Sequence, residues 1–242
     1  ESDGQHSETL ARLPGGFLCY RPPGDAPPVA PLPSLRRGAL TFASFNNRPK
    51  ITPPVLSAWA AILRGAPGAR LLLKSAGLGE AAGQERLLRD LGDLGVEPSR
   101  VELCGLVADE REHLARYGEV DVALDTFPYC GTTTTCEALW MGVPVVTLVG
   151  ETFAQRVGAS LLHQVGMDEL VCEHEAGYVE SVAALAADAP RRAALRERLE
   201  RERTTSPLFD GERFARDFEA LCERLWARAC AGLAPEHLPA GN

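Results

Sequence analysis

From about residue 40 onward, short apolar segments alternate with longer segments that repeat with the period of a helix. The apolar segments are four to six residues long, which suits buried strands. We expect strands at residues 40–45, 70–74, 101–104, 120–125, 144–149 and 169–172. Helical patterns cover residues 54–65, 80–94, 109–117, 133–141 and 153–165. Strands joined by helices pair in parallel through right-handed crossovers, so the chain is predicted to be an α/β protein with a doubly wound parallel sheet.

The two ends of the chain differ from this central alternation. The N-terminal segment contains seven prolines around the apolar residues 17–20, which predicts an extended linker lying on other parts of the molecule. The C-terminal segment is helical and charged. Pro190 suits a first helical turn, and Asp210 suits the cap of a helix that ends near Ala229. We therefore expect a linker, a sheet domain, a helical extension and a flexible tail at residues 1–39, 40–175, 176–231 and 232–242.

Composition excludes several classes of function. The chain has 25 Lys and Arg against 33 Asp and Glu, a formal net charge of −8 without a basic block, which argues against nucleic-acid binding and a polybasic membrane anchor. No apolar run approaches the roughly 20 residues of a membrane helix. The seven cysteines include no Cys-x-x-Cys, so we expect reduced thiols in a cytoplasmic protein. Because the chain begins at Glu1 without a signal-like segment, we expect a piece of a longer protein.

The most informative segment is residues 125–148, which reads as strand end, tight loop, helix and next strand. Asp125 ends an apolar run, Pro128 and Gly131 mark the loop, and four threonines open the helix. The free N–H groups of such a helix start can hold a phosphate without a metal. Glu137, one turn later, can accept two ribose hydroxyls. The same pattern also fits a threonine-rich cap on an ordinary crossover helix, and local spacing leaves both interpretations open.

Other candidate residues follow neighbouring strands, where doubly wound sheets bind their ligands. Lys50 can neutralise a phosphate, and His113 and Arg116 are spaced to share one helical face toward a diphosphate. Taken alone, each of these residues is explained better by a solvated surface. The chain lacks the Gly-x-x-x-x-Gly-Lys, His-Glu-x-x-His and Gly-x-Ser-x-Gly motifs, and its histidines form no apparent metal cluster. The residues alone thus indicate a metal-independent domain that binds a nucleoside diphosphate.

An ordered series of motifs extends this interpretation. They are Asn46-Asn47 with Lys50-Ile51 and Pro53, Val107-Ala108 with His113 and Arg116, residues 125–129 and 140–144, Gly150-Glu151-Thr152, residues 156–160 and residues 206–209. Together they resemble the C-terminal catalytic lobe of the O-GlcNAc transferase/SPINDLY family, and its bacterial members most closely. The resemblance implies the Rossmann-like C-terminal lobe of a GT-B glycosyltransferase that modifies Ser or Thr of proteins.

The resemblance also implies roles for individual residues. Lys50 is expected to stabilise the leaving nucleoside diphosphate, and Asn47 to face it. Ala108 is expected to meet the nucleobase through its backbone. The remaining donor-binding residues implied are His113 beside the nucleotide, Arg116 nearby, Gly131, Thr132, Thr133 and Thr134 at the helix start, with Thr133 and Thr134 on the diphosphate, and Glu137 on the ribose. No metal or other cofactor is expected.

Two departures concern the donor sugar. Animal O-GlcNAc transferases carry His where this chain has Thr132, and Lys where it has Glu110. Residues 131–137 look instead like SPINDLY, whose plant members transfer fucose from GDP-fucose. Residues 150–152 and the following helix look like the O-GlcNAc members. We favour UDP-GlcNAc as the donor and keep GDP-fucose as the alternative.

Parts of the implied enzyme are not visible in this sequence. In the family an N-terminal lobe supplies much of the acceptor face and the proposed proton-transfer groups, and tetratricopeptide repeats select protein acceptors. A helix that begins near Asp210 is expected to return to that lobe. We therefore expect this chain to bind donor weakly and to be inactive alone. A non-catalytic nucleotide-sugar-binding scaffold remains an alternative, whereas an epimerase would need catalytic carboxylates and His around the sugar, which are not apparent.

Overall fold

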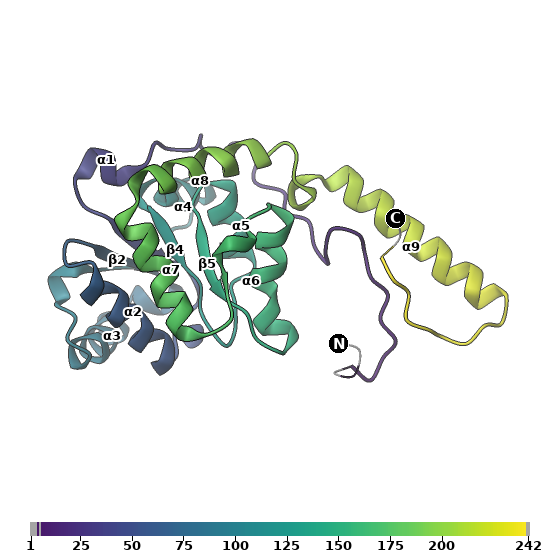
Figure 1. Ribbon diagram of the computed structural model, residues 1–242, viewed down its shortest axis with the longest axis horizontal. Coiled ribbons are helices and arrows are strands. Elements are labelled where there is room, and N and C mark those ends of the chain that lie inside the picture. The colour runs from purple at the N-terminus through teal and green to yellow at the C-terminus, as the bar shows by residue number, and fades with distance from the viewer. Residues whose placement is uncertain (1–3, 5, 241–242) are drawn as a thin grey trace.

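The computed structural model describes residue 4 and residues 6–240. Six strands form one sheet in the order β3-β2-β1-β4-β5-β6 (Figure 1). Each neighbouring pair is parallel, which confirms the predicted doubly wound sheet. The strands are β1 (Thr41–Ser44), β2 (Arg70–Lys74), β3 (Val101–Cys104), β4 (Val122–Leu124), β5 (Val145–Leu148) and β6 (Val171–Cys172).

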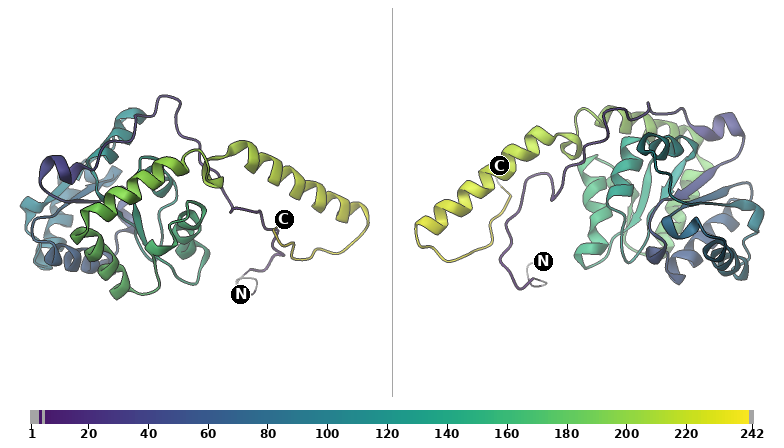
Figure 2. Two further views of the ribbon diagram at one scale, coloured as in Figure 1. Left: turned by 45° about the horizontal axis from the view of Figure 1, so that its top comes forward. Right: turned by 180° about the vertical axis from the view of Figure 1, so that it is seen from behind.

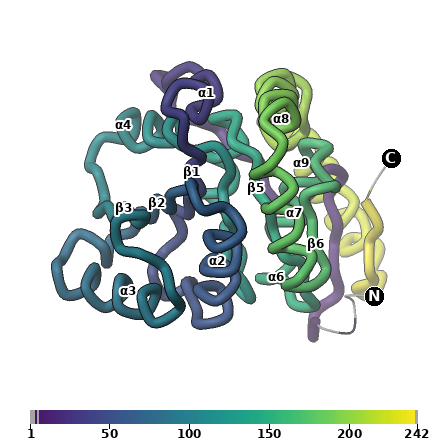
Figure 3. The backbone as a smooth tube through the Cα atoms, turned by 60° about the vertical axis from the view of Figure 1, so that its left-hand side comes forward, coloured from purple at the N-terminus to yellow at the C-terminus, as the bar shows by residue number. Residues whose placement is uncertain are grey.

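The helices between the strands follow the predicted patterns and cover both faces of the sheet. They are α2 (Pro53–Gly65), α3 (Ala81–Asp93), α4 (Glu110–Ala115), α5 (Thr133–Trp140) and α6 (Phe153–Gln164). Figure 3 shows α4 on one side of β1, β2 and β3, and α2 and α3 on the other. The connections also contain short 3-10 helices, η2 (Arg48–Lys50), η3 (Ala76–Leu78), η4 (Pro98–Arg100), η5 (Arg116–Glu119) and η6 (Asp168–Leu170).

The strand order places a topological switch point between β1 and β4. The chain leaves β1 toward β2 on one side, and leaves β4 toward β5 on the other, so the connections diverge above the carboxyl ends of these two strands. Open α/β sheets bind ligands at such a switch point. All four residues of β1 are buried, as expected for a central strand that is covered on both faces.

The C-terminal helices extend this body. They are α7 (Glu175–Ala187), α8 (Ala189–Glu202) and α9 (Gly211–Cys230), with η7 (Pro207–Phe209) between the last two. Pro190 lies in the first turn of α8, and the Asp210 carboxylate caps α9 by accepting from the Arg213 N–H at 2.9 Å, both as predicted. Figures 1 and 2 show α9 projecting away from the sheet. In the part of the chain described above, each helix is too short or too polar to cross a bilayer.

The N-terminal segment is extended except for one short helix, α1 (Pro33–Arg37). It contacts the C-terminal helices. The Tyr20 N–H donates to the Leu208 carbonyl at 2.8 Å, and Arg196 of α8 donates to the Ala30 carbonyl at 3.0 Å. The expected tail also has a partner, because the Leu238 N–H donates to the Leu10 carbonyl at 2.9 Å and the Leu238 side chain is buried. The first and last parts of the chain therefore run side by side near α9 (Figure 2).

Gly158 brings α6 close to the end of β4. A Cβ added to Gly158 would lie 2.6 Å from Asp125 Oδ2 and would also overlap the Thr147 hydroxyl. Real Cβ atoms do not approach polar atoms so closely, so this position admits only glycine without a shift of the helix. Gly158 therefore allows α6 to pack directly against the end of β4.

We expect Gly158→Ala to lower the free energy of unfolding by about 1–3 kcal/mol, because the added methyl overpacks a buried contact. Urea denaturation of the whole chain measures the change. Gly92→Ala in α3 is the matched control, because a Cβ there meets no atom within 4 Å. The control should be neutral or stabilising by up to about 1 kcal/mol, since alanine favours helix. Equal stability of the two variants would contradict the close packing.

Candidate functional site

The Asp125 carboxylate organises the loop between β4 and α5. It is buried, and its Oδ1 accepts from the N–H groups of Thr126 at 2.9 Å and Gly131 at 2.7 Å. Its Oδ2 accepts from the Thr147 hydroxyl at 2.7 Å. Burial raises the pKa of Asp125, while these hydrogen bonds oppose that shift by favouring the charged form. One carboxylate therefore closes the turn over residues 126–131 from the inside.

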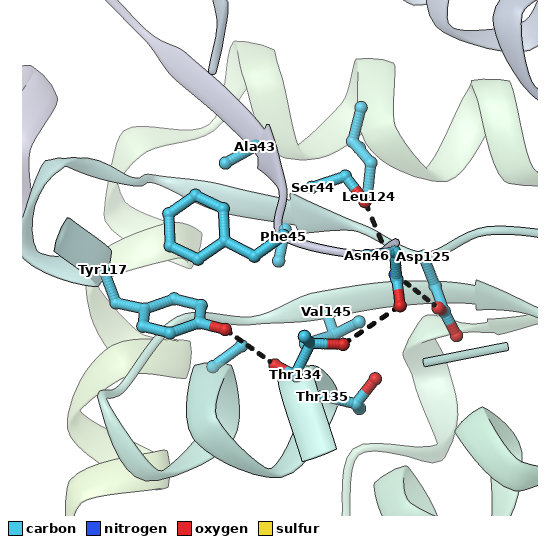
Figure 4. A pocket seen from close by; sticks show the side chains of 12 residues that line it. Ala43, Ser44, Phe45, Asn46, Tyr117, Leu124, Asp125, Thr134, Thr135 and Val145 are labelled. Carbon is cyan, nitrogen blue, oxygen red and sulfur yellow. Dashed lines mark hydrogen bonds between the residues drawn. The ribbon is translucent and has the colours of Figure 1, made fainter. Parts of the chain in front are cut away.

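Asn46 joins this loop to β1. Figure 4 shows its side chain between Asp125 and Thr134, where its amide nitrogen lies 3.4 Å from Asp125 Oδ1 and its oxygen accepts from the Thr134 hydroxyl at 3.0 Å. Gly131 lies so close that an added Cβ would be 2.6 Å from the Thr135 hydroxyl and 2.9 Å from Asn46 Oδ1. The cavity among these side chains has a volume of only about 20 Å³. It belongs to the packing beneath the loop and is too small for a nucleotide.

Lys50 places a cation at the loop before α5. Its ammonium donates to the Cys130 carbonyl at 2.7 Å and lies 4.0 Å from the centre of the exposed Tyr129 ring. Burial lowers the pKa of Lys50, and the Asp125 carboxylate opposes that shift. The amine is thus fixed next to the residue that precedes Gly131, where it can meet an anion at the start of α5.

The start of α5 carries no side-chain cap. The Thr132 hydroxyl at the N-cap makes no capping hydrogen bond, and the Thr133 side chain is exposed. The Thr134 hydroxyl is used inside the protein, because it donates to Asn46. An uncapped helix start presents free backbone N–H groups and the positive end of the helix dipole, which suits a phosphate.

A second polar cluster surrounds Glu137, one turn into α5. Glu137 Oε2 lies 2.9 Å from Nε2 of His113 and accepts from the Tyr117 hydroxyl at 3.0 Å. The other ring nitrogen of His113, Nδ1, lies 2.8 Å from the ammonium of Lys74. Phe45 packs against the rings of His113 and Tyr117, so the cluster is partly shielded from solvent.

The structure brings together some of the predicted site residues and separates others. Lys50, at the end of η2, contacts the loop that leads into Gly131 to Thr134, and His113 contacts Glu137 directly. Arg116 instead contacts Glu119 at 2.7 Å and Cys104 Sγ at 2.8 Å, because α4 ends at Ala115 and tightens into η5. These contacts hold Arg116 within the protein, and its place beside a diphosphate stays a prediction. Asn47 and Ala108 are exposed, each just before a helical turn.

Sequence reasoning missed the parts played by Asn46 and Lys74. The family resemblance assigns a donor contact to Asn47 and none to its neighbour Asn46, although Asn46 lies just beyond the buried strand β1. Lys74 directly follows the apolar run Leu71-Leu72-Leu73, and a lysine at the carboxyl end of such a strand is the signal that the sequence offers. The structure shows that this lysine is buried.

The thiols and the acidic residues add no further reactive group here. All seven cysteines are free, and burial raises the pKa of Cys130 to about 11 and that of Cys136 to about 12, so both stay neutral thiols. In residue 4 and residues 6–240, no group of three or more His, Cys, Asp or Glu side chains is arranged to hold a metal ion.

Comparison with known proteins identifies the family. The model of glycosyl transferase family 41 matches residues 32–218. The chain belongs to this family. Named relatives are similar to this chain over nearly its whole length, which confirms the O-GlcNAc transferase/SPINDLY resemblance seen in the sequence.

Three relatives show how much of the chain is shared. The probable UDP-N-acetylglucosamine–peptide N-acetylglucosaminyltransferase SPINDLY of Solanum lycopersicum is 46% identical over 231 residues, which are 96% of this chain and 25% of that protein. The UDP-N-acetylglucosamine–peptide N-acetylglucosaminyltransferase of Caenorhabditis elegans is 35% identical over 201 residues, 83% of this chain and 17% of that protein. A solved mutant of Thermobaculum terrenum O-GlcNAc transferase is 40% identical with a TM-score of 0.82, covering 88% of this chain and 40% of that one.

These matches fix the fold of the family 41 chain as a GT-B glycosyltransferase lobe. They also show that it spans about a quarter of the length of the SPINDLY relatives.

We expect Asp125→Asn to lower the free energy of unfolding by about 1–3 kcal/mol, because an amide N–H₂ would face donors that now meet a carboxylate oxygen. Asp168→Asn is the control, since that side chain is 64% exposed and its contact with His163 lies at the surface. Chemical denaturation of both variants measures the difference. Asp125→Asn as stable as the control would mean that the carboxylate does not hold the loop.

Proposed function

We propose that this chain is the donor-binding half of a metal-independent glycosyltransferase that moves GlcNAc from UDP-GlcNAc to Ser or Thr hydroxyls of proteins. The observation that carries the proposal is the convergence of Lys50, the uncapped start of α5 and Glu137 at the switch point of the sheet. A cation beside free N–H groups suits a diphosphate, and a carboxylate one turn later suits ribose hydroxyls.

The proposed reaction needs charge stabilisation on the donor side. The acceptor oxygen bonds to C1 of the sugar while the bond from C1 to the phosphate oxygen breaks, and the nucleoside diphosphate leaves with the bonding electrons. Lys50 and the N–H groups of α5 stabilise the charge that grows on the leaving diphosphate. The hydroxyl proton passes to groups outside this chain. Asn47, Ala108 and Arg116 complete the proposed donor contacts, with Ala108 at the nucleobase.

The choice of donor rests on the relatives. The names of the SPINDLY and Caenorhabditis elegans relatives specify UDP-N-acetylglucosamine, which supports UDP-GlcNAc here. GDP-fucose is the second candidate, because Thr132 and Glu110 depart from the animal O-GlcNAc transferase pattern and residues 131–137 look like SPINDLY.

The rest of the proposed enzyme lies outside this chain. We assign residues 1–39 to the linker and the end of an N-terminal lobe, residues 40–175 to nucleotide-sugar binding and residues 176–231 to the helical part of the same lobe. Trp226 on α9 is 72% exposed, and Phe218 on the same helix is 52% exposed. Such side chains support contact with an N-terminal lobe, while tetratricopeptide repeats are the proposed selectors of protein acceptors. The free thiols support a reducing compartment such as the cytoplasm.

Calorimetric titration of this chain with UDP, UDP-GlcNAc, GDP and GDP-fucose tests the donor assignment. We expect weak binding of the uridine nucleotides, weakened at least about tenfold by Lys50→Ala because a charge-assisted contact to phosphate is lost. Arg36→Ala is the control, since Arg36 is an exposed cation of α1, at the amino end of β1. Tighter binding of GDP and GDP-fucose than of the uridine nucleotides would instead support the fucosyltransferase alternative. Equal loss in both variants, or retained binding in Lys50→Ala, would contradict the assigned site.

We expect the 242-residue chain alone to transfer no sugar, because the proposed acceptor and proton-transfer groups lie elsewhere. Transfer of radiolabelled GlcNAc to a Ser/Thr peptide measures this, with the full-length protein as the positive control. Turnover by the isolated chain would defeat the division into two halves. Lys50→Ala in the full-length protein then separates an enzyme from a scaffold, since a non-catalytic scaffold has no turnover to lose.

A further inference from the structure

Lys74 is an unusual residue at the end of β2. Its side chain is only 3% exposed, although it carries an ammonium group. Within residue 4 and residues 6–240 it forms no ion pair with a carboxylate, and its polar contact is with Nδ1 of His113 at 2.8 Å. Burying a lysine without a carboxylate partner is costly, so a fold that keeps it there has a use for the group that it contacts.

The two polar contacts of His113 indicate which of its nitrogens carries the proton. The ammonium of Lys74 has donors and no lone pair, so Nδ1 of His113 accepts from it. The carboxylate of Glu137 only accepts, so it requires a proton on Nε2. The proton of the neutral ring then lies on Nε2, which donates to Glu137 Oε2 at 2.9 Å. Burial lowers the pKa of Lys74, whereas the Glu137 carboxylate opposes that shift. The three side chains thus form a directed chain of donors that runs from β2 through α4 to α5.

This chain of donors holds one oxygen of Glu137 and leaves the other open. Oε2 accepts from His113 Nε2 and from the Tyr117 hydroxyl at 3.0 Å. Oε1 accepts no hydrogen bond from any residue that the structure describes. The carboxylate is therefore fixed in orientation by two donors on one oxygen, with the second oxygen available to a ligand hydroxyl.

We propose that Lys74 is a positioning residue for the donor nucleotide, which holds the His113 ring through Nδ1 and through that ring aims Glu137 Oε1 at the ribose hydroxyls. The inference rests on the proposed function, because it assigns a donor ribose to Glu137. It adds a residue that touches neither the nucleotide nor the sugar.

The geometry separates this role from plain packing. An apolar side chain of equal length would fill the same space at the end of β2, and it would spare the protein a buried charge. Such a side chain would leave His113 Nδ1 without a donor, and the ring would keep a single hydrogen bond, the one from Nε2 to Glu137. A donor at position 74 fixes the second nitrogen of the ring.

The test compares Lys74→Met with Lys74→Arg, which keeps a donor, and with Arg70→Met at the exposed start of the same strand. Nitrogen-15 NMR of the His113 ring reports the hydrogen bond at Nδ1 in the chain without nucleotide, with the signal assigned through its loss in His113→Gln. We expect the same Nδ1 signal in the wild type and in Arg70→Met, and a shifted Nδ1 signal in Lys74→Met, where no donor faces this nitrogen. Lys74→Arg should restore the wild-type signal. An unchanged ring in Lys74→Met would overturn the proposal.

Calorimetry with UDP and 2′,3′-dideoxy-UDP gives the second readout, or the guanosine pair if the chain prefers guanine. We expect Lys74→Met to weaken binding of the ribose nucleotide about tenfold and to leave the dideoxy nucleotide unchanged. Equal weakening of both nucleotides would indicate a structural role and overturn the proposal. If the wild type binds neither nucleotide, the proposed function fails, and so does the ribose part of this inference. The NMR measurement then still decides whether Lys74 holds His113 at Nδ1.

Discussion

The structure depends on a buried carboxylate at the point where its parallel sheet changes direction. Asp125 ends β4, and its two oxygens hold the loop to α5, the neighbouring strand β5 and, through Asn46, the end of β1. Gly158 lets α6 approach the same group, and Gly131 lets the loop pass beneath α5. Four elements therefore meet at one acceptor. The placement of Lys50 follows from this arrangement, because its ammonium is held by the Cys130 carbonyl within the same loop.

A second group of polar side chains is built on other elements. Lys74, His113 and Glu137 come from β2, α4 and α5, and they meet because these elements surround the carboxyl ends of the strands. The two groups divide the proposed work: a cation and helix N–H groups face the diphosphate, and a carboxylate faces the ribose. Neither group is formed by adjacent residues, so the sheet topology, more than any local motif, assembles the site.

Much of this arrangement could be predicted from the sequence. Strand β2 appears in the sequence as an apolar run because Leu71, Leu72 and Leu73 are all buried. Asp210 and Pro190 mark helix starts through their own chemistry. The position of Arg116 could not be predicted, because a spacing of three residues fits an α-helix and a 3-10 turn alike. Asn46 and Asn47 differ by one residue in register, which sequence composition does not resolve. In the sequence Lys74 marks only the end of a strand. Its contact with His113 could not be predicted, because the two residues are far apart in the chain.

The closed loop over residues 126–131 also has an entropic consequence. Ordering a backbone residue costs roughly 1–2 kcal/mol, and this loop is ordered by Asp125 as part of folding. A ligand that meets a loop already in place does not bear that cost at the moment of binding. The buried carboxylate thus shifts the entropic penalty from recognition to folding, and a weakened Asp125 network would transfer it back to the ligand.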